Sequence, residues 1–280
     1  MTLLPFCAVI LDEARDGVLL QDIERLNDIL ASVVQRDSPE VHDIFTRFRQ
    51  HGINRQADVD DEAPLQRMIQ CAKDLTNENA LGVMRCFSIA LNLVNSAEVH
   101  HRMRVLRQYE LEADQVSTDG GPLPMTEDSM RGTIQTLIDN GHTKDEIFDA
   151  IMKQKVEIVL TAHPTEVNRR TILVKYKKVS EQLAILDRPD LNPYMEAEAT
   201  GALKRIIASI WGSDEIRRTK PTPQREALGG IAIIESVLWD AVPEYFRKLD
   251  AQLKLSVGDR LPIDAVPIRF SSWIGTGYII

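Results

Sequence analysis

The sequence predicts a mainly α-helical chain that ends in the first elements of a parallel β/α structure. Apolar residues recur at steps of three and four along most of the chain, which is the period of one helix face. Two short runs, V-E-I-V-L-T-A (156–162) and V-P-I-R-F-S-S-W (266–273), instead have the character of strands. A strand, a helical crossover and a second strand are typical of parallel pairing. Because two strands form no stable sheet alone, the pattern indicates the opening of a larger β/α structure.

The first half of the chain is predicted to be helical. Residues 18–34 place their apolar side chains on one stripe. Ser38 is expected to be the N-cap of a second helix, and Gly52 is expected to stop it near residue 50. A long helix is expected over roughly 79–112, including L-N-L-V-N-S-A-E at 91–98.

The second half mixes helices with the two strand-like runs. Thr143 begins T-K-D-E, which fits a capping box at a helix start. The run at 156–162 is predicted to be a buried strand, after which Thr165 can cap a helix that extends to about residue 186. Further helices are expected over about 193–211 and 224–255, the second bent at Pro243.

Composition excludes several functional classes. The chain has 280 residues, 44% hydrophobic and 27% charged, which is typical of a globular protein. A net charge of −9 argues against nucleic-acid binding, although a local arginine cluster can still bind an anion. Three cysteines without a C-x-x-C pair argue against disulfides and zinc and fit a reducing compartment. No basic stretch precedes apolar residues 3–11 and no span of membrane length was found, so we expect a cytoplasmic protein.

The candidate site begins with His163, which follows the first strand-like run. In parallel β/α folds ligands bind at the carboxyl ends of the strands, and an imidazole there can exchange a proton near neutral pH. Thr165 offers a hydroxyl, while Arg169 and Arg170 offer fixed positive charge and forked donors. This combination suits a small molecule that carries phosphate or carboxylate. A structural histidine followed by two solvated or ion-paired arginines is the alternative interpretation.

Two other features favour structural roles. The stretch H-H-R-M-R (100–104), continued by Arg107, is predicted to form a solvated face or intramolecular ion pairs. Trp211 and Trp239 lie on apolar helical faces and are predicted to be core residues. Trp273 differs because it ends the second strand-like run, where binding residues gather.

Several blocks resemble one enzyme family. V-L-T-A-H-P-T-E-V-N-R-R (159–170) resembles the histidine motif of phosphoenolpyruvate carboxylases. Four more stretches are similar to other blocks of that family, in the family's order: L-N-L-V-N-S-A-E (91–98), W-G-S-D-E-I-R-R-T-K-P-T-P (211–223), E-S-V-L-W-D-A-V-P (235–243) and R-F-S-S-W (269–273). The resemblance therefore covers nearly the whole chain.

The resemblance implies an architecture and an assembly. It implies an N-terminal helical region over residues 1–154 and, over 155–280, the start of an incomplete (β/α)8 TIM-type barrel with two strands and intervening helices. It also implies a homotetramer as the assembly of the full-length enzyme.

The resemblance also implies a reaction. Phosphoenolpyruvate and bicarbonate would give oxaloacetate, which feeds the tricarboxylic acid cycle, and phosphate, with Mg²⁺ or Mn²⁺ as cofactor. His163 would be the catalytic base that deprotonates carboxyphosphate. Thr165, Arg169, Arg170 and Trp273 would bind the substrate, with Arg169 positioning the anion.

One departure limits what the resemblance implies. After F-S-S-W the family continues with a methionine, two glycines and D-R-D-G-N-P, whereas this chain reads I-G-T-G-Y-I-I over residues 274–280. The chain thus looks like the N-terminal third of the enzyme, without its metal ligands, and we expect negligible activity from it alone. Two alternatives stay open: a non-catalytic helical module or regulatory partner of full-length carboxylase subunits, and a different phosphate-handling enzyme that reuses the histidine motif.

Overall fold

The computed structural model describes residues 2–3, 10–11, 13–58, 60–119, 129–160, 170–215 and 222–272. The chain divides into two compact units, each made of two chain segments. We call residues 1–108 with 168–216 the helical unit, and residues 109–167 with 217–280 the strand unit. Each unit is described by itself. The division predicted after residue 154 follows from the family resemblance and stays a prediction.

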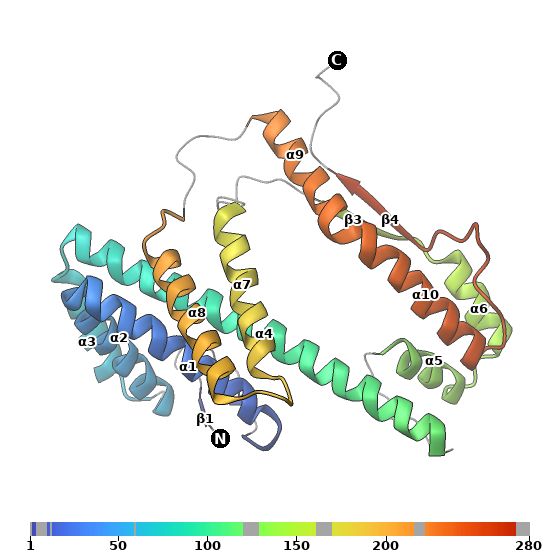
Figure 1. The fold of residues 1–280 in the computed structure, drawn as a ribbon, viewed down its shortest axis with the longest axis horizontal. Coiled ribbons are helices and arrows are strands. Elements are labelled where there is room, and N and C mark those ends of the chain that lie inside the picture. The colour runs from blue at the N-terminus through green and yellow to red at the C-terminus, as the bar shows by residue number, and fades with distance from the viewer. Residues whose placement is uncertain are drawn as a thin grey trace. The chain divides into compact units, whose positions relative to one another are not determined.

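The helical unit is built from six helices and one short hairpin among its described residues (Figure 1). The hairpin pairs β1 (Thr2–Leu3) with β2 (Ile10–Leu11) in antiparallel fashion. The helices are α1 (Glu13–Asp37), α2 (Pro39–Ala57), α3 (Ala63–Lys73), α4 (Asn77–Asp119, of which the part to Gln108 belongs here), α7 (Arg170–Leu186) and α8 (Pro193–Trp211).

One apolar core holds the helical unit together. The predicted stripe of α1 is confirmed from Leu19 onward, because Leu26 and Val34 are completely buried and the other Leu, Ile and Val side chains there are nearly so, whereas Val18 is exposed. Side chains from α2, α4, α7 and α8 complete the core. By length and composition α4 could cross a membrane over Asn77–Tyr109, but 44% of its most apolar window is buried in the protein, as in a core helix. That property is therefore weak evidence for a membrane role.

The strand unit combines shorter helices with a parallel strand pair. Its elements are α5 (Met130–Asp139), α6 (Lys144–Lys153), β3 (Val156–Leu160), α9 (Pro223–Ile233), the π-helical turn η1 (Ile234–Leu238), α10 (Trp239–Ser256) and β4 (Ile268–Ser272). Thr143 forms the predicted capping box, in which its hydroxyl accepts from Glu146 N–H and the Glu146 carboxylate accepts from Thr143 N–H. A small core joins α5, α6 and α10 around Leu253.

The predicted strands exist and pair in parallel, with Val156 opposite Ile268 and Leu160 opposite Ser272. The prediction that the first strand is buried is wrong for the described residues. Val156, Ile158 and Val159 are each more than a third exposed, because β3 pairs only with β4 among the described strands. Their apolar side chains point to both faces, which is typical of parallel strands that other elements cover on both sides.

Two local predictions differ from the structure. The second helix continues through Gly52 to Ala57, where a glycine inside a helix is merely less stable than alanine. Trp239 is 76% exposed rather than buried, whereas Trp211 is buried as predicted. The long helix also contains a π-helical turn at Ile234–Leu238 before it continues through Pro243 in α10, and the bend at Pro243 stays a prediction.

The buried core of the helical unit predicts that shortening one of its side chains strongly lowers the stability of the fold. Leu203 on α8 is completely buried, so Leu203→Ala should lower the free energy of unfolding by about 2–5 kcal/mol. Urea unfolding followed by circular dichroism would measure the change. Leu173→Ala is the matched control on exposed surface of α7 and should change stability little. Equal effects at the two positions would contradict the assigned core.

Candidate functional site

The strand pair brings two chain segments to one edge. β3 ends at Leu160 and β4 ends at Ser272, and these residues lie opposite each other. His163 follows Leu160 by three residues and Trp273 directly follows Ser272. The carboxyl ends of the two strands therefore lie side by side, and this is the end at which parallel β/α folds bind ligands.

The predicted site residues themselves fall outside the described part of the chain. His163, Thr165 and Arg169 belong to residues 161–169, and Trp273 belongs to 273–280. Arg170 is the first residue of α7, and only its backbone is described. The roles of all five residues therefore stay predictions, and the described structure contributes the elements that precede and follow them.

The helix that follows the histidine motif is anchored to α8 by a lysine. Lys175 Nζ donates to the carbonyl oxygen of Ser209 at 2.9 Å and to Ser213 Oγ. Carbonyls in the last turn of a helix have no partner inside the helix, so a lysine there satisfies one of them. The second turn of α7 is thereby attached to the last turn of α8.

An arginine of α4 secures the same end of α8. Arg85 Nη2 donates to the carbonyl oxygens of Trp211 at 2.6 Å and Ser213 at 3.0 Å. Its guanidinium carbon also lies 4.9 Å from the centre of the Trp211 ring, a cation–π distance. Nothing in the sequence pattern singles out Arg85, because a lone arginine inside a helix usually lies on a solvated face.

A half-buried carboxylate, that of Glu215, follows this helix end. Ser88 Oγ donates to Glu215 Oε2 at 3.3 Å, while Glu215 Oε1 is buried without a hydrogen-bond partner among the described residues. Burial, followed by the negative charge of Glu215, raises the pKa of Tyr176 far above its usual value, so this phenol stays protonated.

The basic stretch of α4 forms the predicted intramolecular ion pairs. Arg104 Nε and Nη2 donate to the two carboxylate oxygens of Asp187 at 2.8 Å each, and Nη2 also donates to Asp22 Oδ2 at 2.7 Å. His100 Nε2 lies 2.8 Å from Asp187 Oδ2. Arg104 thus joins α1, α4 and the end of α7 through one bidentate and one single contact.

The neighbouring histidine is held in its neutral form. His101 Nδ1 accepts from Arg104 Nη1 at 3.0 Å, and Nε2 lies 3.9 Å from Asp16 Oδ1. Burial and then the positive charge of Arg104 lower the pKa of His101, although nearby aspartates oppose the shift. The stretch therefore acts as a structural clamp among the helices, as its composition favoured.

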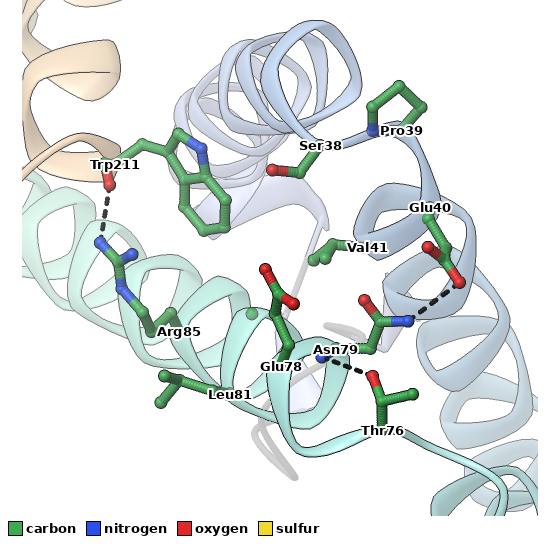
Figure 2. A pocket seen from close by; sticks show the side chains of 11 residues that line it. Ser38, Pro39, Glu40, Val41, Thr76, Glu78, Asn79, Leu81, Arg85 and Trp211 are labelled. Atoms are coloured by element: carbon green, nitrogen blue, oxygen red, sulfur yellow. Dashed lines mark hydrogen bonds between the residues drawn. The ribbon is translucent and has the colours of Figure 1, made fainter.

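A hollow of about 630 Å³ lies between the starts of α2 and α4 and the end of α8. Figure 2 shows the side chains that line it. Its polar lining is mostly paired: Asn79 donates to Glu40 at 2.9 Å, and Arg85 contacts the Trp211 carbonyl. The Trp211 ring lies at one edge, near Ser38. The described residues that line this hollow assign it no ligand.

The described residues contain no cluster of side chains that could bind a metal ion. No group of three or more histidine, cysteine, aspartate or glutamate side chains there could hold an ion. The described part of the chain therefore contributes no candidate site for Mg²⁺ or Mn²⁺.

Comparisons with known proteins give one consistent result. The family model described as phosphoenolpyruvate carboxylase matches residues 19–277. A phosphoenolpyruvate carboxylase of Pseudomonas putida is 37% identical over 260 residues, which is 93% of this chain and 28% of the relative. That of Alcanivorax borkumensis is 36% identical over 266 residues, 95% of this chain and 29% of the relative. This chain thus spans less than a third of the length of these curated relatives.

The clamp at Arg104 predicts a pH-dependent loss of stability. Arg104→Met should lower the free energy of unfolding by roughly 2 kcal/mol at pH 6, less than the ~3–5 kcal/mol of a fully buried pair because water reaches the cluster. Burial opposes the shift, but hydrogen bonds from Arg104 and His100 lower the pKa of Asp187. A carboxylate with a lowered pKa stabilises the fold above its ordinary value of about 3.9, and this contribution is lost as pH falls through the folded value.

Urea unfolding of both proteins across pH 3.5–7 would measure the difference. The difference between wild type and Arg104→Met should therefore shrink as the pH falls below about 4. Arg188→Met, which breaks an exposed pair with Asp190, is the control and should have little effect at any pH. A difference that stays constant with pH would contradict the assigned clamp.

Proposed function

Because this chain belongs to the phosphoenolpyruvate carboxylase family, we propose that it carries the proton-handling part of a carboxylase site that a longer family sequence completes. The supporting observation is the match over residues 19–277, which includes the histidine motif and both strands. The parallel register supports the same proposal, because Leu160 and Ser272 end the two strands opposite each other, three residues before His163 and one before Trp273 in the sequence. The relatives' names do not favour a purely structural helical module.

The proposed reaction combines phosphoenolpyruvate with bicarbonate. A bicarbonate oxygen attacks phosphorus, and the bond from phosphorus to the enol oxygen breaks, which yields carboxyphosphate and the enolate of pyruvate. Loss of the carboxyl proton from carboxyphosphate lets its bond to phosphate break and releases CO₂. The methylene carbon of the enolate then attacks CO₂, and the products are oxaloacetate and phosphate.

His163 is the proposed base for carboxyphosphate. An imidazole with an ordinary pKa near 6.5 is largely neutral at pH 7 and can accept this proton through a ring nitrogen. General-base help of this kind contributes about 10²–10⁴-fold to a rate. His163 can then release this proton to solvent, which returns the imidazole to its neutral form for the next turnover.

The remaining predicted residues would hold the anionic reactants. Arg169 and Arg170 supply fixed charge and planar donor pairs that match phosphate and carboxylate. Thr165 supplies a hydroxyl close to His163 in the chain, and Trp273 supplies an apolar wall that limits water. Arg169 is the proposed anion-positioning residue, since a helix that began at Thr165, as the sequence predicts, would carry both residues on one face.

A divalent cation, Mg²⁺ or Mn²⁺, would neutralise negative charge on the phosphate and enolate when bound. Its ligands are proposed to come from the part of the family sequence that this chain does not span. The residues of this chain would bind the organic anions and handle the proton.

The fold proposal follows the same logic. We infer that β3 and β4 are the first two strands of a (β/α)8 barrel, since their apolar side chains lie on both faces and further strands would pair with their outer edges. A cytoplasmic location and a tetrameric full-length assembly complete the proposal, and both rest on the family resemblance and composition.

Activity measurements test the proposed function. The purified 280-residue chain with phosphoenolpyruvate, bicarbonate and Mg²⁺ should form no measurable oxaloacetate. A chimera in which residues 19–277 replace the matching region of the Pseudomonas putida relative should form it. His163→Asn should lower the rate of the chimera at least about 100-fold.

His142→Asn is the matched control, because His142 is an exposed histidine in the described part of the strand unit. It should leave the rate of the chimera unchanged. Turnover by the isolated chain, or an active His163→Asn chimera, would contradict the proposed division of labour.

The two adjacent arginines should differ in their effect. In the chimera, Arg169→Gln should weaken phosphoenolpyruvate binding by about 10- to 100-fold, because a hydrogen-bonded charge contributes about 1.5–3 kcal/mol. Arg170→Gln should have a smaller effect. Titration of substrate against intrinsic fluorescence would report affinity without requiring turnover. A larger loss in Arg170→Gln would reverse the assignment of Arg169.

A further inference from the structure

Helix α4 has two apolar faces, and the helical unit uses only one of them. The inner face carries side chains that are completely buried in the core, including Cys86, Ile89 and Leu93. The outer face carries six large apolar side chains that are 44–70% exposed: Leu81, Met84, Leu91, Val99, Met103 and Leu106. We call these six residues the outer face of α4.

The spacing of the outer face is that of a helix-packing surface. Its members follow one another at intervals that keep them on the side opposite the buried face, and Ser88 and Asn95 occupy the intervening positions. From Leu81 to Leu106 the face extends roughly 38 Å at 1.5 Å per residue. Scattered apolar residues on a surface need no explanation, but six large ones aligned on one helix face over this length mark an interaction site, even with polar residues between them.

Packing within the helical unit does not account for the apolar outer face of α4. A helix on the surface of a globular protein normally turns charged and polar residues outward, and α4 does so only at intervals. No described element of this unit covers the outer face, as its exposure shows. The core of this unit therefore forms without burying the outer face of α4.

We propose that the outer face of α4 is the surface onto which the remaining part of a phosphoenolpyruvate carboxylase chain packs, through an amphipathic helix. This inference rests on the family membership that also underlies the proposed function. The relatives carry more than two thirds of their length beyond the region that this chain matches, so a partner of sufficient size exists in the family. Helix against helix is the packing that a three- and four-residue spacing fits.

The charges at one end of α4 indicate which charges the partner helix should carry. Arg102 and Arg107 are exposed at the end of α4 where Val99, Met103 and Leu106 lie. A partner helix with an apolar stripe and acidic residues near that end would complement this surface. The same arginines, with Glu98 and His100 nearby, oppose immersion of this helix in lipid, where ionisable groups are costly.

Copurification tests the inference. The 280-residue chain would be coexpressed with a tagged polypeptide that comprises the Pseudomonas putida relative outside its region of similarity. Wild type should copurify with that polypeptide. The double substitution Leu91→Glu with Val99→Glu should reduce the recovered complex at least tenfold, since it places two charges in an apolar interface.

A matched pair provides the control. Leu173→Glu with Val174→Glu changes the same residue types at similar exposure on α7, and it should copurify as wild type does. Equal recovery of the α4 double variant and wild type would overturn the inference, as would no recovery of wild type with a soluble partner. Two other results would also overturn it: self-association of wild type that the α4 substitutions abolish, and binding to phosphatidylcholine–phosphatidylglycerol vesicles through this face.

Thermal unfolding gives a second readout that does not depend on the partner folding alone. In the isolated chain, Leu91→Glu with Val99→Glu should change the Tm little, because both side chains are exposed. In the full-length chimera the same substitutions should lower the Tm clearly, and no difference between the two contexts would overturn the inference. Failure of the proposed function would look different: the complex would form and show the normal Tm but make no oxaloacetate.

Discussion

Burial of the inner face of α4 is the constraint on which the helical unit depends. Ile89, Leu93 and Ala97 are completely buried among side chains of the surrounding helices, so the core cannot form unless α4 is in place. The polar contacts of Arg85 and Arg104 then set where α4 lies along its neighbours. Apolar burial supplies most of the driving force, and these directional contacts select one arrangement.

The same helix connects the core with the proposed chemistry. Arg104 binds Asp187 just after α7, and Arg85 binds the end of α8, to which Lys175 attaches the second turn of α7. The helix that follows the histidine motif is therefore held by groups that take no part in the proposed reaction. Such a rigid support is what a catalytic segment requires if its side chains are to keep a productive geometry.

In the strand unit, by contrast, the apolar strand residues are not buried. Its two strands pair correctly, yet Val156, Ile158 and Val159 stay exposed. The apolar outer face of α4 in the helical unit is uncovered as well. A chain that spans 28% of its relatives' length would leave such surfaces wherever the longer sequence supplies the covering elements. Both units therefore expose apolar side chains, as we expect of a chain that spans only part of its relatives' length.

The sequence by itself determined the features that depend on neighbouring residues. The capping box at Thr143, the helix over 193–211 and the buried stripe of α1 could be predicted because caps, proline and apolar period act within a few residues. The parallel strand pair was also predictable, since a helical crossover separates the two runs. The histidine motif indicated the family, while the positions of its side chains stay predictions.

Only the tertiary structure decided what is buried and what binds across the chain. Gly52 did not stop its helix, Trp239 proved exposed, and the first strand lacked the cover that its composition predicted. The carbonyl partners of Arg85 and the carboxylate partners of Arg104 lie more than 80 residues away in the sequence. Burial and long-range pairing depend on which elements pack together, and a local pattern carries no information about surfaces that are distant in the chain.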